Sequence, residues 1–452
     1  MREEGDLKLA IESKSLVLGI VGLGYVGLPT AISFFNSGFK IWGVDKSYDV
    51  VNKIKSGENP TGDPSLDKMI PPSDDENWNI SQSFSESIPN CDIIIVTVPT
   101  PVNSAMGMES SFVSEAGREI FSNIKAGSGK IVVLESTVYP GSTMELWSPI
   151  IGEFDLELGK DIWIGYCPER HNPGDLSNNL STVSRVIGCS DKYIGESLVS
   201  LYSKMTSGEV RYVGGITVAE SSKLVENIQR DINIALVNEL ATILPEMGVD
   251  IEEVLDAAST KWNFHRYTPG IGVGGHCIPV DPYFIIDKAK FQGLQANLVS
   301  SAREINESMP MFAHRQICSI IGSHYPDMAS KPRALFLGWS YKPNIGDVRG
   351  SPSIELHRLM KESDFEILCL DPHVREGDLP EDIELIEGIY EAQGVDIAVL
   401  VTAHDEISSI NWDELKGCMN KPVIYDGRRS LDLDSLDETG WSTYAIGKPT
   451  NL

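Results

Sequence analysis

A cysteine follows a glycine-dense stretch in the second half of the chain, and an aspartate comes four residues after it. Residues 270–276 read Gly-Ile-Gly-Val-Gly-Gly-His, and Cys277 and Asp281 follow. So many glycines disfavour a helix and fill little core volume, so the segment predicts a loop whose backbone is approached closely. A thiol beside such a loop is a candidate nucleophile, and a small buried cysteine is the structural alternative.

A second candidate site lies near the amino terminus, where an apolar run ends in a Gly-x-Gly-x-x-Gly motif and continues as a helix-like segment. These glycines permit a tight turn and the close approach of a pyrophosphate at the positive end of the helix. Asp45 ends the next short strand, 21 residues after Gly24, at the spacing of a carboxylate that binds ribose hydroxyls. That carboxylate repels the 2′-phosphate of NADP, although Lys46 beside it acts in the opposite direction. We therefore predict an NAD site, with a nucleotide-free turn as the alternative, at Gly22, Gly24, Tyr25, Val26, Gly27 and Asp45.

Composition excludes several classes of protein. The 452 residues indicate two or three domains, and 65 acidic against 37 basic residues give a formal charge of −28, which disfavours nucleic acid and anionic membranes. No apolar run is long enough to span a membrane, and residues 1–14 are polar rather than a signal sequence. Seven scattered cysteines without Cys-x-x-Cys pairs argue against a disulfide framework or a metal site. We expect a soluble, cytoplasmic protein without metal, nucleic acid or membrane partner.

The chain up to about residue 210 alternates short β-branched strands with helical segments, which is the pattern of a parallel sheet. Loops that contain Pro99, Thr137 and Glu169 follow three of these strands. Ligands gather at the carboxyl ends of parallel strands. We therefore expect these three residues to face one crevice.

Beyond about residue 217 the hydrophobic period becomes that of a helix. Lys223 and Asn227 are four residues apart, so they share one face of it, which is either solvated or part of the site of the reactive cysteine. The prolines and glycine at 310, 322, 326 and 332 predict a bracketed helix and a linker, and strands from about residue 334 resume the α/β alternation. We predict an α/β protein with two Rossmann-like, doubly wound parallel-sheet domains joined by a central helical domain.

Seven segments carry a resemblance that extends over almost the whole chain. They are Gly22–Pro29, Val98–Pro101, Glu135–Thr143, Tyr166–Arg170, Lys223–Asn227, Gly274–Pro282 and Tyr341–Pro352. In order and spacing they resemble the UDP-glucose/GDP-mannose dehydrogenase family, the nucleotide-sugar 6-dehydrogenases. The resemblance implies an NAD-binding domain over residues 1–212, a central dimerisation domain with the cysteine loop over 213–328, and a UDP-sugar-binding domain over 329–452.

The activity implied by this resemblance is a four-electron oxidation of a sugar CH₂OH to a carboxylate with two NAD⁺. Cys277 is the implied nucleophile, forming first a thiohemiacetal and then a thioester that water hydrolyses. Lys223 and Asn227 are implied to stabilise the oxyanions. The remaining implied roles are general-base work for Asp281, thioester hydrolysis for Glu169 and the binding of a water for Thr137.

Ligand contacts are implied in the same way. Besides the glycine motif, the cofactor is expected to contact Pro99, Thr100 and Thr137, and the substrate Glu169, Arg170, Lys223, Asn227, Arg266, Gly274, Lys342 and Arg349. The segment around Arg266 is only loosely similar to the family, and Gly346 stands where an acidic residue is common. The central helices are expected to form a homodimer.

The choice of sugar is read from two positions. His276 and Val280 resemble the branch that acts on UDP-N-acetylhexosamines, whereas UDP-glucose enzymes usually carry serine and lysine there. We place UDP-N-acetyl-D-mannosamine first, with the N-acetylglucosamine and N-acetylgalactosamine epimers and UDP-glucose as alternatives. An alcohol dehydrogenase without a covalent step and a non-catalytic nucleotide-binding protein are the other hypotheses.

Overall fold

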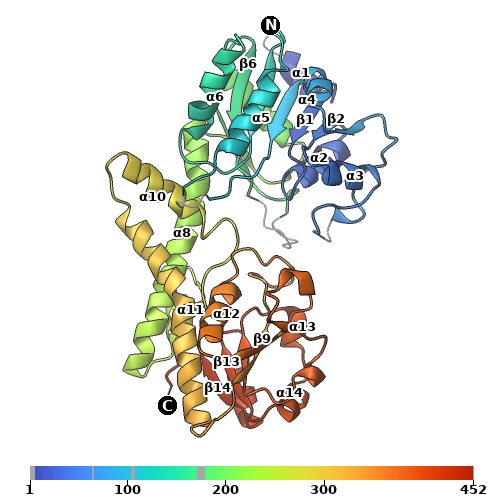
Figure 1. Cartoon of the computed structure of the whole chain (residues 1–452). Coiled ribbons are helices and arrows are strands. Elements are labelled where there is room, and N and C mark those ends of the chain that lie inside the picture. Colours follow the sequence, from blue (N-terminus) through green and yellow to red (C-terminus); the bar gives the residue numbers. More distant parts are fainter. Residues whose placement is uncertain (1–5, 64–65, 103–106, 171–178, 451–452) are drawn as a thin grey trace. The chain divides into compact units, whose positions relative to one another are not determined.

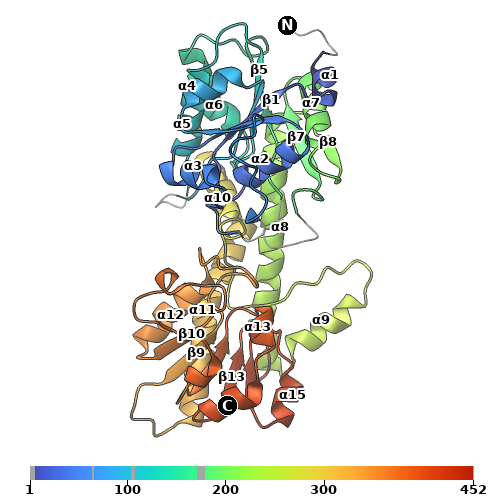
Figure 2. The same cartoon turned by 90° about the vertical axis from the view of Figure 1, so that its right-hand side faces the viewer.

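A computed structural model describes residues 6–63, 66–102, 107–170 and 179–450. The chain forms two compact units that divide between Glu226 and Asn227, inside one long helix. Figure 1 shows the first unit in blue to green and the second in green to red, and Figure 2 gives a second view. The predicted three-domain boundaries at residues 212 and 328 stay a prediction.

The first unit is built on an eight-stranded sheet of order β3-β2-β1-β4-β5-β6-β7-β8. Every pairing is parallel except that of β6 with β7. The order from β3 to β6 is that of a dinucleotide-binding Rossmann sheet, with its switch point between β1 and β4. The strands are β1 Val17–Val21, β2 Lys40–Val44, β3 Trp78–Ser81, β4 Ile93–Val96, β5 Lys130–Leu134, β6 Ile162–Tyr166, β7 Arg185–Cys189 and β8 Val210–Tyr212.

Helices bury both faces of this sheet. One cluster joins alternate strand residues such as Ile20 and Ile95 to α2 and α7, while the intervening Ile94 and Val132 are also fully buried. Strands buried on both faces read as continuous apolar runs, which explains the β-branched segments of the sequence. The helices are α1 Asp6–Glu12, α2 Gly27–Asn36, α3 Tyr48–Lys55, α4 Phe84–Ser87, α5 Ser111–Phe121, α6 Ser142–Glu153 and α7 Lys192–Tyr202.

Four further helices lie between the two sheets in the sequence. They are α8 Ile216–Ile243, α9 Ile251–Ser259, α10 Asp281–Phe291 and α11 Asn297–His324. Helix α11 runs through Pro310, so the prediction that this proline brackets the helix is wrong. Met309, Pro310 and Ala313 are buried, and this packing offsets the one backbone hydrogen bond that proline cannot donate.

The second unit contains an all-parallel sheet of order β11-β10-β9-β12-β13-β14, which repeats the Rossmann order. Residues of α11 and α12 pack on one face, and residues of α13, α14 and α15 pack on the other. The predicted fold class is therefore confirmed. The elements are β9 Arg333–Leu337, α12 Pro352–Glu362, β10 Glu366–Leu370, β11 Glu384–Leu385, β12 Ile397–Leu400, α13 Asp405–Ser408, α14 Trp412–Cys418, β13 Val423–Asp426, α15 Leu433–Glu438 and β14 Ser442–Ala445.

Candidate active site

The glycine motif forms the turn from β1 into α2. Gly22 has φ +90°, a conformation that a side chain disfavours, and a Cβ on Gly27 would lie 1.8 Å from the Gly22 carbonyl oxygen. A Cβ on Gly24 would meet no atom within 4 Å. Val26, the N-cap of α2, makes no side-chain capping bond. Two glycines thus close the turn, and the third leaves open space before the helix, as a pyrophosphate requires.

Asp45 follows β2 and braces this turn. Its carboxylate accepts hydrogen bonds from the amides of Leu23 at 2.7 Å and Ser47 at 2.8 Å. The cation next to it, Lys46, pairs with Glu115 at 3.1 Å, which offsets the charge that would attract a 2′-phosphate. The residues present therefore fit NAD, and Lys46 does not favour NADP in this arrangement.

Three more loops meet the carboxyl edge of this sheet. The Ser136 hydroxyl donates to the Val98 carbonyl at 2.6 Å, and the Tyr166 hydroxyl donates to the Ser136 carbonyl at 3.0 Å. These bonds connect the ends of β4, β5 and β6. The loop with the predicted cofactor residues Pro99 and Thr100 and the loop with Thr137 are thereby brought together within the first unit.

Glu220 on α8 fixes the loop that carries Thr137, and sequence reasoning missed it. Its buried carboxylate accepts from the amide of Gly141 and from the amide and hydroxyl of Thr143, the last two at 3.0 and 2.6 Å. A carboxylate at the N-terminus of α6 is favoured by the helix dipole. Lys223 comes three residues after Glu220, so its turn of α8 is held close to the Thr137 loop. In the sequence, Glu220 is one polar residue of a helical pattern, and nothing there indicates this contact.

Glu169 lies in the loop after β6 and is held by a buried arginine. Arg185, at the start of β7, donates from Nη2 to Glu169 Oε2 at 2.6 Å, and its side chain is fully buried. The amide of Arg170 donates to Glu169 Oε1 at 2.7 Å, and the Arg170 guanidinium pairs with Glu226. Both Glu169 and Arg170 thus have defined orientations in the first unit.

In the second unit, Cys277 lies in the turn that leads into α10, four residues before the first helical residue, Asp281. Its carbonyl accepts from the amides of Val280 and Asp281, and the carboxylate of Asp281 accepts from the Asn227 side-chain amide. Cys277 is half-buried, whereas five other cysteines are buried. Burial raises the pKa of Cys91 and Cys167 to about 12, so those thiols stay protonated. The predicted group of Cys277, Asp281 and Asn227 is brought together.

The glycines before Cys277 allow a close approach by the chain itself. A Cβ on Gly274 would lie 2.6 Å from Tyr341 Cβ, and one on Gly275, which has φ +92°, would lie 2.8 Å from the Tyr341 ring. The cysteine loop therefore packs directly against the loop that carries Lys342. This contact is a reason for the bare backbone in addition to the predicted approach of a ligand.

A buried polar network anchors the start of the same glycine loop. The Gly270 amide donates to Asn238 Oδ1 at 2.9 Å, and the Asn238 side-chain amide donates to Asn306 Oδ1 at 2.8 Å. Asn306 and Arg303 on α11 both donate to Asp231 Oδ1 on α8. The network therefore locks the two long helices to the loop that ends in the cysteine, and each partner is far away in sequence.

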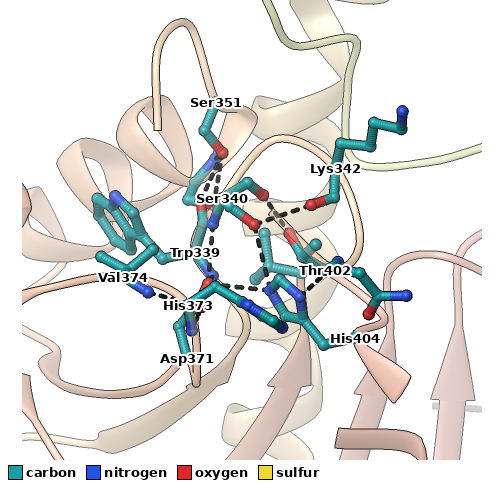
Figure 3. Close-up of polar contacts among 12 residues, drawn as sticks. Trp339, Ser340, Lys342, Ser351, Asp371, His373, Val374, Thr402 and His404 are labelled. Atoms are coloured by element: carbon teal, nitrogen blue, oxygen red, sulfur yellow. Dashed lines mark hydrogen bonds and ion pairs between the residues drawn. The ribbon is translucent and has the colours of Figure 1, made fainter. Parts of the chain in front are cut away.

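A second network holds the turn before Lys342 (Figure 3). Asp371, which follows β10, accepts from the amides of Trp339 and Ser340 at 2.7 and 3.0 Å, and His404 Nε2 lies 3.0 Å from the same oxygen. The Ser340 hydroxyl donates to the Lys342 carbonyl at 3.0 Å. Figure 3 shows the Lys342 side chain pointing away from these residues, so the network fixes the lysine backbone.

Ser340, His404 and Asp371 are not a nucleophilic triad. His404 Nδ1 accepts from the Asn344 amide at 2.9 Å, and Nε2 faces both the Ser340 hydroxyl at 3.1 Å and Asp371. A triad needs one ring nitrogen for the nucleophile and the other for the acid. Burial acts to raise the pKa of Asp371, but the bond from His404 and the two amides outweigh it and lower the pKa to about 2. The cluster is a structural clamp.

The other predicted substrate contacts are held by carboxylates. Arg349 donates from Nε and Nη2 to Asp347 at 2.9 and 2.6 Å, and Arg266 pairs with Glu252 and Asp256 of α9. These arrangements give each guanidinium a counter-charge within the second unit.

The structure gives a steric reason for glycine at position 346, where an acidic residue is common in the family. A Cβ there would lie 2.3 Å from the His373 carbonyl oxygen, so this loop excludes an acidic residue.

The two sheets share a feature at their switch points. Gly22 and Gly338 follow β1 and β9 with φ +90° and +84°, and their added Cβ atoms would meet the carbonyls of Thr97 and Thr402. A Rossmann unit whose glycine turn fits NAD, in a chain that also contains a second such unit and a half-buried cysteine loop, indicates an NAD-dependent oxidoreductase of the dinucleotide-binding class.

Comparison with known proteins gives the family. The NAD binding, central and UDP binding domains of the UDP-glucose/GDP-mannose dehydrogenase family match residues 17–206, 217–308 and 335–433. The chain therefore belongs to the UDP-glucose/GDP-mannose dehydrogenase family. It is an NAD-dependent UDP-sugar 6-dehydrogenase, as the resemblance implied, and the hypothesis of a non-catalytic protein is set aside.

Relatives cover nearly the whole chain. It is 33% identical over 428 residues to the UDP-N-acetyl-D-glucosamine 6-dehydrogenase of Pseudomonas aeruginosa, with 94% of this chain and 99% of that protein aligned. It is 32% identical over 438 residues to the UDP-N-acetyl-D-mannosamine dehydrogenase of Methanocaldococcus jannaschii, with 96% of each aligned. The structure of the UDP-D-ManNAc dehydrogenase of Pyrococcus horikoshii superposes with a TM-score of 0.85 at 30% identity, covering 96% of this chain and 100% of that one.

Within the described residues, no single helix is long and apolar enough to cross a membrane. The bent pair formed by residues 216–247 and 251–259 passes that test by length and composition.

Proposed function

We propose that this enzyme oxidises C6 of a UDP-N-acetylhexosamine, with UDP-N-acetyl-D-mannosamine as the first choice, to the uronate through a thioester on Cys277. The supporting observation is the half-buried Cys277 four residues before α10, whose first residue, Asp281, accepts a hydrogen bond from the Asn227 side-chain amide. Covalent capture keeps the intermediate aldehyde from escaping.

The proposed chemistry assigns a task to each side chain. The Gly22–Gly27 turn would hold two NAD⁺ molecules in succession, each of which would accept one hydride. Asp281, ordered by Asn227, takes the C6 hydroxyl proton through water or Lys223. The Cys277 thiolate then attacks C6 of the aldehyde and forms the thiohemiacetal, whose oxidation gives the thioester.

Hydrolysis of the thioester completes the sequence. Water bound by Thr137 attacks C6, Glu169 takes a proton from that water, and the C6–S bond breaks to release the carboxylate and the Cys277 thiolate. Lys223 and the Asn227 amide stabilise the oxyanion at C6 in each stage, since a cation and a donor one helical turn apart can reach one oxygen.

We propose substrate contacts from Arg170, Arg266, Gly274, Lys342 and Arg349. The structural observations that bear on these contacts differ from residue to residue. Gly274 packs on the residue before Lys342, which brings those two positions together in the second unit. Arg349 and Arg266 have carboxylate partners, which a diphosphate would have to replace.

The sugar preference is the first testable consequence. His276 and Val280 stand where UDP-glucose enzymes carry serine and lysine, and the relatives above are named for N-acetylated sugars. We expect about two NADH per UDP-N-acetylhexosamine consumed, because four electrons leave C6, and little NADH with UDP-glucose. A panel of UDP-sugars followed at the NADH absorbance measures both quantities. Equal turnover of UDP-glucose would contradict the proposed preference for N-acetylated sugars, and one NADH per sugar would contradict the double oxidation.

We also propose a homodimer through the central helices. Val218, Val225, Leu236 and Ile243 are 54, 62, 53 and 42% exposed on α8. At about 100° per residue their spacings of 7, 11 and 7 place them within about 20° of one line along the helix. A second copy of the same helix would bury this stripe, as an isologous interface requires.

The dimer is tested by charge on the stripe. The double variant Val225→Glu and Leu236→Glu should sediment as a monomer at micromolar concentration, because each carboxylate would have to be buried without a partner. The matched control is Leu9→Glu on α1, which is 68% exposed and should leave the dimer intact. A double variant that still sediments as the dimer would overturn the proposed interface.

A further inference from the structure

A buried cluster of ionisable side chains lies behind Glu169, and none of the roles above uses it. Arg185, from the start of β7, contacts Glu169 and also lies 3.9 Å from Glu135 Oε2 through Nη1. Glu135 directly follows β5 and is fully buried, as is Arg185. Tyr202, at the end of α7, donates its hydroxyl to Glu135 Oε1 at 2.6 Å. Cys167 Sγ lies 3.9 Å from Arg185 Nη1.

One guanidinium therefore serves two carboxylates. Within the described residues, Glu135 Oε2 and Arg185 Nε are buried and have no hydrogen-bond partner. Buried groups of this kind are costly unless they are paired, so a structural role alone predicts a satisfied pair rather than this shared one. The contact with Glu169 is the short, hydrogen-bonded one, and Glu135 supplies charge from the opposite side.

We propose that Arg185 and Glu135 are positioning residues for Glu169, with Arg185 fixing its carboxylate and Glu135 setting, by its own protonation, how strong a base that carboxylate is. The inference rests on the proposed role of Glu169 in thioester hydrolysis. Glu135 and Arg185 need not touch the substrate, because they act through the Glu169 side chain.

The direction of the effect follows from the charges. Burial raises the pKa of Glu135 to about 7, with Arg185 and the Tyr202 hydroxyl opposing the rise and the Glu169 charge adding to it. Below that pH Glu135 is neutral, and Glu169 does not share the charge of Arg185 with a second anion. Above it a second anion shares Arg185, so the Glu169 anion is stabilised less and binds a proton more strongly. Burial raises the pKa of Cys167 to about 12 and that of Tyr202 well above its usual value, so both stay neutral in this range.

Hydrolysis should therefore quicken as pH rises through about 7. We expect kcat to rise about threefold to tenfold between roughly pH 6 and 8, since a nearby like charge shifts a carboxyl pKa by about one unit and general-base rates follow base strength. The Glu135→Gln side chain is neutral at every pH. This variant should keep the low kcat of the wild type at acidic pH, show no rise of kcat through this pH range, and leave KM unchanged. Quenched turnover at about pH 8, analysed by intact mass spectrometry, should show more Cys277 thioester in Glu135→Gln than in the wild type.

Three further variants make the outcome decisive. Tyr202→Phe removes a bond that lowers the Glu135 pKa, so the inflection should move to higher pH, and this result does not depend on Glu135→Gln folding. Asp161→Asn removes another buried carboxylate of the first unit and should keep the wild-type profile. Glu169→Gln should be slow at every pH. If Glu169→Gln is fully active, the proposed function of Glu169 fails. If Glu169→Gln is inactive while Glu135→Gln and Tyr202→Phe keep the wild-type profile, this inference alone fails.

Discussion

Replacing Cys277 by alanine should lower the rate of uronate formation by on the order of 10³-fold or more, because the second oxidation then has no thiohemiacetal on which to act. The half-buried thiol lies in a loop fixed from both sides, so removing one sulfur atom should leave the fold intact. Uronate formation measured by mass spectrometry, with NADH followed in parallel, gives the result. NAD binding, measured by fluorescence titration, should be unchanged.

The matched control is Cys318→Ala on α11, the other half-buried cysteine. It should retain wild-type turnover, since it lies outside the glycine loop. Should Cys277→Ala make uronate at the wild-type rate, the covalent route would be wrong, and a dehydrogenase that hydrates its aldehyde without a thioester would replace it.

Replacing Lys223 by methionine should lower kcat about 10²- to 10³-fold, because a donor aimed at an oxyanion contributes most in the transition state. Methionine keeps the length and apolar stem of lysine and favours a helix, so α8 should persist. Substrate binding should change much less than kcat, and steady-state kinetics with isothermal titration of the UDP-sugar separates the two.

Lys192→Met on α7 serves as its control, since that side chain is 79% exposed. It should retain wild-type kcat. A Lys223→Met enzyme that loses affinity for the UDP-sugar while keeping kcat would show that the lysine binds the ground state rather than the oxyanion.

Much of the fold could be predicted because its signals are local. The strand that begins at Val17, the Gly22–Gly27 motif and Asp45 lie within 29 residues of one another, and the motif and the aspartate each have a steric or electrostatic reason that the structure displays. The turn of α8 with Lys223 and Asn227 was likewise visible as a helical period. The prediction that Pro310 brackets a helix is wrong because packing around α11 overrides the local preference of proline.

The positioning side chains could not be predicted, because their partners are distant in sequence. Glu220 contacts the Thr143 loop 77 residues away, Arg185 contacts Glu169 16 residues away, and His404 contacts Asp371 33 residues away. Each reads in the sequence as an ordinary polar residue. The reason for Gly346 is equally non-local, because the His373 carbonyl, 27 residues later in the sequence, lies where a side chain at this position would be.

The paired switch-point glycines have a consequence for how this chain can vary over generations. Alanine at Gly22 or Gly338 would be strained by the positive φ, and at Gly338 its methyl group would lie 2.4 Å from the Thr402 oxygen. Substitution of the glycine that follows the first strand of the sheet is therefore disfavoured in both halves of the chain. The acid that follows the neighbouring strand braces the turn in both halves, Asp45 through the Leu23 amide and Asp371 through the Trp339 amide, and Asp371 additionally contacts the imidazole of His404.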